Sequence, residues 1–450
     1  MRTFGKVIVA GIVVFAALQA VRPTIPSGPA TAEVQAPPEV RHIFEKDCYS
    51  CHSDQRRLAW FDQVVPAYWL VRRDILTARR HLNFSTLGSK PAAAQKAALY
   101  EAVNMIQLGA MPLPSFRKLH PEAMVTPAEL ATLKAYLAPW TPVPVHAPPP
   151  AQESAAMAEI APAALAAQAE FNGLPFDPGF EGWKWISATD RGDNNTFRLI
   201  LGNDIAFRAA QSVNISPWPD GAQFAKIAWS QELGADGLMH PGSFVQVELM
   251  LKDAQRYRDT DGWGWGRWRG LTLKPYGADS HFVNECTGCH RPVSGNDYVY
   301  TLPVTAAHVD RDEVVNSRAA ALPAGLPYDP LKLSPITIYV DSRNRTAAIL
   351  FGNETAMQAV HARSANGVAP AYQAGSELAL VTWAQRDDPH WFGARIPDAP
   401  QSVEFIQVAA GPKNIYRQFA APGLKEIQAS ESAAAQRTNF VLGLAPARLP

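Results

Sequence analysis

Residues 194–203 read NNTFRLILGN, and residues 344–353 read NRTAAILFGN. A second pair of matching segments follows in the same order, with GAQFAKIAWSQ at residues 221–231 and GSELALVTWAQ at residues 375–385. Two ordered matches indicate an internal repeat, which has to be recognised before a fold is assigned. We therefore predict two related domains in the C-terminal part of the chain.

These repeats are expected to be mainly antiparallel β. Residues 196–201, 224–229 and 244–251 are short runs rich in aromatic and β-branched residues, with the alternation typical of strands that have one buried face. Alternation over residues 224–229 places Phe224, Lys226 and Ala228 on the face opposite to Trp229.

The region before the repeats reads as helical. Apolar spacing predicts helices over residues 94–108 and 127–137, and Thr126 is a suitable N-cap residue with Pro127 at the first helical position. Residues 142–169 are rich in Pro and Ala and predict a semi-rigid linker. The expected boundaries are a signal peptide or anchor at 1–32, a helical domain at 39–141, the linker, a first repeat at 170–305, a connector at 306–335, a second repeat at 336–430 and a tail at 431–450.

Composition excludes several classes of protein. The 450 residues contain 41 Lys plus Arg and 41 Asp plus Glu, so there is no net field that would hold the chain on nucleic acid. With 47% hydrophobic and 18% charged residues, the chain has enough apolar surface to fold. We expect a folded protein that does not bind nucleic acid.

The N-terminus resembles an export signal. Arg2 and Lys6 precede an uncharged, mostly apolar run over residues 7–20, and Ala30-Thr31-Ala32 offers a small-residue cleavage site. The run of 14 residues is shorter than the roughly 20 residues that span a bilayer, so cleavage is favoured over a permanent anchor. Both outcomes predict a periplasmic protein, either free or attached to the inner membrane.

All four cysteines belong to two copies of one motif. Cys48 and Cys51 precede His52, and Cys286 and Cys289 precede His290, each as CxxCH. Two thiols one helical turn apart can add to the vinyl groups of a haem while the adjacent histidine binds its iron, so we predict two covalently attached haem c groups. The alternatives are zinc knuckles, which need further ligands, and a thiol–disulfide couple, which does not require the histidine.

The two haem groups are expected to differ in their second axial ligand. Met111, in the loop GAMPLP after the first predicted helix, is the candidate opposite His52, where a thioether would raise the reduction potential. Its alternatives are His81 and His120, or a Met111 that only packs in the loop. No comparable methionine follows His290, so the second iron is expected to keep a vacant position.

Two charged residues distinguish the repeats. Lys226 and Arg198 in the first repeat correspond to Leu380 and Ala348 in the second, which has no cysteine. A charge that is present only where a haem is available suggests that Lys226 and Arg198 face the haem. The alternative is that both are solvated charges on strand surfaces.

The helical region resembles a known family, the bacterial haem-binding domain. The residues that carry this resemblance are CYSCHS at 48–53, LNFS at 82–85, GAMP at 109–112 and HPEA at 120–123. The first repeat resembles the cytochrome P-460 family. The residues that carry this second resemblance are GW at 182–183, GN at 202–203, WPDG at 218–221, KD at 252–253, WG at 263–264, CTGCH at 286–290 and DYVY at 297–300.

The second resemblance implies an antiparallel β fold around a five-coordinate haem, with a lysine at the position of Lys226 bonded to the porphyrin edge. Cross-linked members oxidise hydroxylamine, whereas the related beta-type cytochromes c prime bind nitric oxide or carbon monoxide. Hydroxylamine oxidisers are expected to have an acidic residue just after CxxCH, but this chain has Arg291 and Pro292, which disfavours that turnover. Members are often homodimers, so the repeat suggests a pseudo-dimer within one chain.

The expected fold class is therefore multidomain α+β, with a helical c-type cytochrome domain followed by two related, mainly antiparallel β domains. The expected function is a periplasmic di-haem cytochrome in which the second haem binds or oxidises a small nitrogenous molecule. Lys226 and Arg198 would act at that haem, and the His52/Met111 haem would exchange electrons with a periplasmic redox partner. The alternative is a non-catalytic gas-binding or electron-carrier cytochrome.

Overall fold

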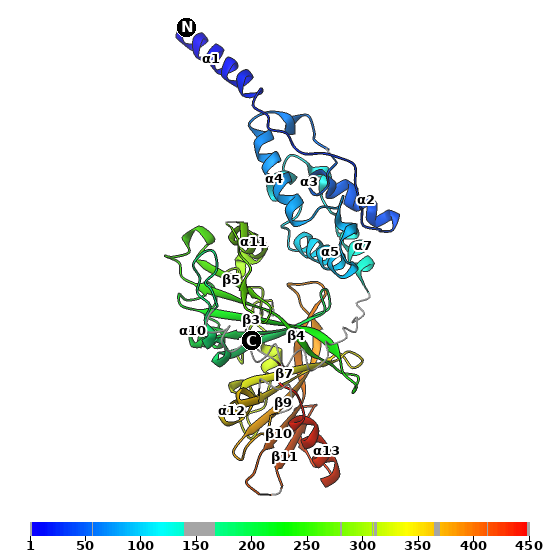
Figure 1. Ribbon diagram of the computed structural model, residues 1–450, viewed down its shortest axis with the longest axis vertical. Helices are drawn as coiled ribbons and strands as arrows, with labels where there is room; N and C mark the ends of the chain where they lie inside the picture. The colour runs from blue at the N-terminus through cyan, green and yellow to red at the C-terminus, as the bar shows by residue number, and fades with distance from the viewer. Residues whose placement is uncertain are drawn as a thin grey trace. The chain divides into compact units, whose positions relative to one another are not determined.

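The structure is a computed structural model, and it forms two compact units, Met1–Trp140 and Thr141–Pro450 (Figure 1). The residues described below are 2–55, 57–138, 167–279, 281–307, 309, 313–363, 370–411 and 413–447. Most of the expected linker, residues 142–166, lies outside this part of the chain.

The N-terminal unit is helical, as expected. Thr126 caps α7 in a capping box with Glu129, whose amide donates to the Thr126 hydroxyl at 3.2 Å. Among the described residues, no helix is both long and apolar enough to cross a membrane. The helices are α1 (Arg2–Leu18), α2 (Pro38–Asp47), α3 (Tyr49–His52), α4 (Ala67–His81), α5 (Ala92–Gln107), α6 (Pro114–Arg117) and α7 (Pro127–Leu137).

The segment between α1 and α2 packs against α4. Ile25 is buried in a cluster with Val65, Tyr68 and Ile75, and Cys51 lies against the same cluster. The Tyr68 hydroxyl donates to the Pro23 carbonyl at 2.5 Å. The helical domain was expected to begin at residue 39, but its packing contacts begin upstream of that position.

The C-terminal unit is built on one antiparallel sheet that closes into an eight-stranded barrel with extra strands at its edges. The closing order is β1-β2-β3-β4-β7-β8-β9-β10, and β10 pairs back to β1. The first four of these strands come from the first repeat and the last four from the second. The strands are β1 (Lys184–Arg191), β2 (Thr196–Gly202), β3 (Gln223–Leu233), β4 (Met239–Lys252), β5 (Trp263–Arg269), β6 (Lys274–Pro275), β7 (Ser334–Asp341), β8 (Thr346–Gly352), β9 (Glu377–Asp387), β10 (Ala394–Gln407), β11 (Ile415–Ala420) and β12 (Lys425–Ile427).

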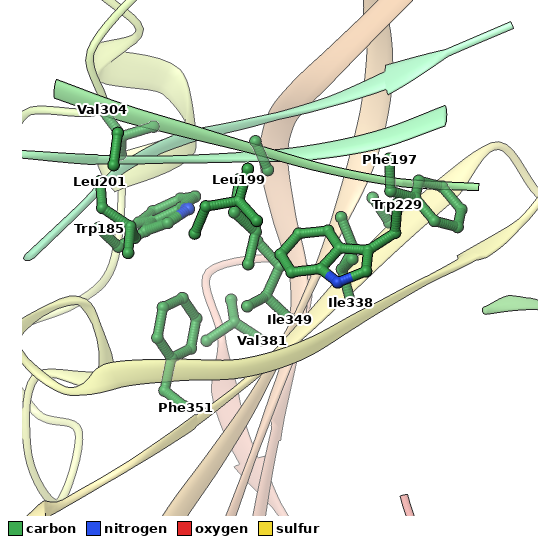
Figure 2. Packing of buried hydrophobic residues seen from close by; sticks show 14 of the residues in the cluster. Trp185, Phe197, Leu199, Leu201, Trp229, Val304, Ile338, Ile349, Phe351 and Val381 are labelled. Atoms are coloured by element: carbon green, nitrogen blue, oxygen red, sulfur yellow. The ribbon is translucent and has the colours of Figure 1, made fainter. Parts of the chain in front are cut away.

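This closure joins the two predicted β domains in one structure. Inward-facing side chains of both repeats share a single core, in which Trp185 and Leu199 lie beside Ile349 and Val381 (Figure 2). A half-barrel of four strands cannot bury its inner face alone, so each repeat covers the other. The two halves therefore form one barrel.

Helices cover the outer face of each half. The helix α10 (Asp204–Gln211) lies after β2, and α12 (Glu354–Arg363) lies after β8 at the matching place in the second repeat. The helix α11 (His281–His290) belongs to the first repeat only. Residues 431–450, expected to be a tail, contain α13 (Glu431–Leu442), whose Val441 is buried against the outer face of the second half.

Candidate functional site

The second CxxCH lies at the end of α11, above the outer face of the first repeat. The Nδ1 of His290 donates to the Tyr298 carbonyl at 2.7 Å, which fixes the tautomer and leaves Nε2 as the free ring nitrogen. Burial lowers the pKa of His290 to about 4, against a smaller opposing effect of this hydrogen bond, so the imidazole is neutral at pH 7. The centroids of the Trp265 and His290 rings are 4.5 Å apart.

The first CxxCH has the same local design. His52 ends α3, and its Nδ1 donates to the Leu82 carbonyl at 2.9 Å, so Nε2 is again the free nitrogen. Burial lowers the pKa of His52 as well. Both histidines are therefore neutral and oriented by a backbone carbonyl, which is the usual arrangement of a histidine that binds iron or another metal.

None of the four cysteines forms a disulfide. Burial raises the pKa of Cys48 to about 12 and that of Cys286 to about 12. A redox-active dithiol usually has a lowered thiol pKa, so these environments do not favour the thiol–disulfide alternative. The zinc alternative needs further ligands, and the described residues contain no group of three or more His, Cys, Asp and Glu side chains placed to hold an ion.

A row of charged residues crosses the sheet of the first repeat. Lys226 on β3 pairs in register with Glu248 on β4, which pairs with Arg267 on β5. The Lys226 ammonium forms an ion pair with Glu248, and the Nε of Arg267 donates to the other carboxylate oxygen at 2.8 Å. Lys226 thus lies on the outer face, as its alternation predicts, while Trp229 lies in the barrel core.

Burial and charge set the protonation of this row. Burial lowers the pKa of Lys226 to about 8, and the neighbouring Glu248 carboxylate limits the shift. Glu248 keeps its pKa below the ordinary value despite burial, because Lys226 and Arg267 stabilise its charge. A lysine with a lowered pKa has a larger neutral fraction, and only the neutral amine is nucleophilic.

Arg198 lies on β2, two residues before Ile200, which pairs with Lys226 in the sheet. Its Nε is buried with no hydrogen-bond partner. Burial lowers the pKa of Arg198 to about 10, with a contribution from the positive charge of Arg191. A buried guanidinium nitrogen without a partner fits a site that receives a further acceptor group.

The second repeat preserves part of this row but covers it with protein. Register places Glu404 at the position of Glu248, beside Leu380 at the position of Lys226. Arg437 of α13 binds the Glu404 carboxylate at 2.6 Å, and the Tyr416 hydroxyl donates to it at 2.6 Å. In the second repeat a cation from α13 therefore pairs with the carboxylate that Lys226 and Arg267 of the sheet itself bind in the first repeat.

The candidates for the second ligand of the first iron differ in their surroundings. Met111 is half-buried in the turn between α5 and α6, where its amide donates to the Met105 carbonyl at 3.1 Å. His120 is buried with Nε2 3.0 Å from Asp62 and Nδ1 3.2 Å from Glu122, so both of its nitrogens are engaged. His81 is exposed at the end of α4. Of the three, Met111 has the side chain that is both partly buried and uncommitted to a polar partner.

Comparison with protein families agrees with this geometry. A model of the haem-binding domain matches residues 8–139, and a model of cytochrome P460 matches residues 177–301. The chain carries a haem-binding domain followed by a cytochrome P460 domain. No curated protein matches the chain. The cytochrome P460 match ends before the second repeat, so half of the barrel lies outside both matches.

The residues chosen from the sequence fit a haem at each CxxCH, because two cysteines outside any disulfide and an imidazole oriented by a carbonyl occur together. At the second site the Trp265 ring also lies beside His290. Sequence reasoning missed Glu248 in the cytochrome P460 domain, although its retention as Glu404 in the other half was visible in principle. It also missed Tyr300, whose ring lies 5.1 Å from that of His290, and the second-repeat loop that contacts Tyr300.

Proposed function

We propose that this protein is an exported c-type cytochrome with two covalently attached haem groups. The haem at His290 would bind or oxidise a small nitrogenous molecule, hydroxylamine or nitric oxide, and the haem at His52 would transfer electrons. The observation that carries the proposal is the repeated design of the two CxxCH sites, each with a pair of cysteines outside any disulfide and a buried histidine whose Nδ1 donates to a carbonyl.

The residues around each CxxCH would have different roles toward the haem. A bound haem supplies an iron that exchanges electrons and, where one axial position is vacant, takes up a small ligand. Cys286, Cys289 and His290 would hold the second haem, while Cys48, Cys51, His52 and Met111 would hold the first. Lys226 would bond through its neutral amine to a carbon of the porphyrin edge, with one hydrogen lost from each atom to a two-electron oxidant such as a peroxide. Arg198 would orient a polar ligand or water.

Mass spectrometry of the digested protein tests the covalent part of this proposal. We expect haem mass on the peptides that contain Cys48 and Cys286, and co-migration of the Lys226 peptide with the latter. Recovery of a free Lys226 peptide from fully haem-loaded protein would reject the lysine bond.

A second experiment tests the catalytic part of the proposal. Addition of hydroxylamine to the oxidised protein should reduce the first haem, and the absence of this reduction would reject hydroxylamine oxidation as the function.

The residues near His290 favour a non-catalytic role. Arg291 and Pro292 follow His290, where an acidic proton acceptor is expected in hydroxylamine-oxidising relatives. In addition, Arg267 engages the nearby carboxylates, with its Nη1 at 3.6 Å from Glu285. Tight binding of nitric oxide without any turnover of hydroxylamine would select this second function.

The proposed location is the periplasm, with export directed by the charged start and apolar run at the N-terminus. Exposed apolar side chains along α1 support attachment to a membrane while the segment is present. A periplasmic redox partner would exchange electrons with the first haem. The two half-barrels support the interpretation of the C-terminal unit as a pseudo-dimer within one chain.

A further inference from the structure

The loop between β9 and β10, residues 388–393, contacts the haem-attachment segment of the other repeat. The Nδ1 of His390 donates to the Tyr300 carbonyl at 2.6 Å. The Trp391 ring meets the Tyr300 ring edge-on, with centroids 5.5 Å apart and planes at 77°. A repeat without cysteines therefore holds a residue beside the CxxCH of its neighbour.

Tyr300 connects this loop to His290. Its ring lies edge-on to the His290 ring, with centroids 5.1 Å apart, and its hydroxyl donates to the Cys289 carbonyl at 2.6 Å. Tyr298, two residues earlier, provides the carbonyl that accepts from His290. Displacement of the Tyr300 backbone would therefore be transmitted to the group that orients the imidazole.

The loop is itself fixed against the first repeat. The indole Nε1 of Trp391 donates to the Asp193 carboxylate at 3.1 Å, and the Arg191 guanidinium lies 4.3 Å from the Trp391 ring centroid. Arg191 and Asp193 form an ion pair and are both buried. The amide of Gly192 donates to the Gly393 carbonyl at 3.0 Å. These contacts give the loop one position relative to β1.

The matching loop of the first repeat lacks these side chains. Between β3 and β4, residues 234–238 read GADGL, whereas residues 388–393 read DPHWFG. The shorter loop lies by the β7–β8 turn, where Gly237 approaches the Arg343 side chain. A histidine and an aromatic pair thus occur only in the loop that meets a CxxCH segment.

We propose that His390 and Trp391 are positioning residues for the His290 imidazole, supplied by the repeat that has no CxxCH. The inference rests on the proposed role of His290 as an iron ligand. Groups that orient a ligating histidine tune the bond between that histidine and the metal. The second repeat would then complete the haem site as well as the barrel.

The test uses the haem-loaded full chain. We would measure the iron–imidazole stretching band of the ferrous second haem by resonance Raman spectroscopy, and the midpoint potential of the same haem. His390→Leu and Trp391→Leu should shift both, while the first haem stays unchanged. His390→Asn keeps an N–H donor and should restore the values toward those of the wild type. Asp236→Asn, in the matching loop of the first repeat, is the control and should shift neither.

Tyr300→Phe provides a milder variant if the leucine variants load haem poorly, because it removes only the hydroxyl that binds the Cys289 carbonyl. It should also shift the stretching band. An unchanged band and potential in His390→Leu and Tyr300→Phe would overturn the positioning role. Failure of the underlying function has a separate signature: His290→Gly would then leave the iron–imidazole band of the wild type intact.

Discussion

Glu248 holds together three cationic side chains on the outer face of the first half-barrel. It pairs directly with Lys226 and Arg267, and its charge also stabilises the protonated form of Arg198. Lysine at such a site can serve two roles, as an ion-pair partner when charged and as a nucleophile when neutral. Glu248 therefore stabilises the charged form of Lys226 and limits its neutral fraction.

Glu248→Gln should lower the free energy of unfolding and alter the second haem. A broken buried ion pair costs about 3–5 kcal/mol, but the Lys226 side chain is 31% exposed, so we expect about 2 kcal/mol. Loss of the carboxylate should lower the pKa of Lys226 further. Thermal unfolding and the absorption spectrum of the second haem measure these effects. Glu404→Gln is the matched control, since it should destabilise the barrel and leave that spectrum unchanged.

Met111→Leu should lower the midpoint potential of the first haem. A thioether opposite imidazole raises the potential, and leucine fills similar space without a sulfur ligand. Redox titration of the purified protein measures the change, and the second haem should keep its potential. Met124→Leu changes an exposed methionine of the same unit and should have no effect. Equal potentials in Met111→Leu and wild type would assign Met111 to loop packing.

At the scale of elements, the segment after α1 behaves as part of the haem-binding domain. Gln19 and Val65 exchange hydrogen bonds at 3.1 and 3.0 Å, and the amides of Thr31 and Ala32 donate to the Ser85 carbonyl at 3.0 Å. Signal cleavage after Ala32 would remove these contacts together with buried Ile25. The sequence favours cleavage there, because the charged start and the apolar run are typical of a leader. The contacts that this segment makes with the rest of the domain cannot be read from its composition.

Deletion of residues 1–32 should therefore destabilise the haem-binding domain. Burial of an isoleucine contributes about 1.5–3 kcal/mol and each hydrogen bond about 1 kcal/mol net, so we expect a loss of about 3 kcal/mol or more. Denaturant unfolding followed at the first haem measures it. Deletion of residues 1–17 is the control, because the described side chains of that stretch are exposed and the packed segment remains. Similar stability of the two truncated proteins would contradict the packing role.

At the scale of the whole molecule, the strands were predictable from the sequence but the closure of the barrel was not. The strands β2, β3 and β4 follow from alternation and are confirmed, and Lys226 lies on the face opposite to Trp229, as that alternation requires. Closure of the barrel was not predictable, because the β1–β10 and β4–β7 pairs are held by backbone hydrogen bonds that leave no mark in residue type. Glu248 and the His390 loop were missed for a related reason, since their contacts join segments that are far apart in the sequence.

One buried carboxylate links the two half-barrels and gives their association a pH dependence. Asp190 on β1 accepts from Gln231 at 2.6 Å and from Gln385 at 2.9 Å, and these glutamines occupy matching positions in the two repeats. The carbonyl oxygens of both glutamine side chains are buried without partners. Burial raises the pKa of Asp190 to about 6 from 3.8, with the two glutamines opposing the shift.

The folded protein therefore binds a proton at Asp190 between about pH 4 and pH 6, whereas the unfolded chain does not. The stability contributed by this proton is fully present below pH 3.8 and is lost as the pH rises through about 6. The free energy of unfolding should fall by about 3 kcal/mol over this range. Asp190→Asn should flatten the contribution of this group, because an uncharged amide has no proton to lose. Its N–H can donate to a glutamine side-chain oxygen once that glutamine amide turns by 180°. Unfolding of the C-terminal unit in denaturant from pH 4 to pH 7 measures the difference. An identical pH slope in Asp190→Asn and wild type would mean that Asp190 stays ionised inside the barrel, and that the two glutamines and the Arg395 charge offset its burial.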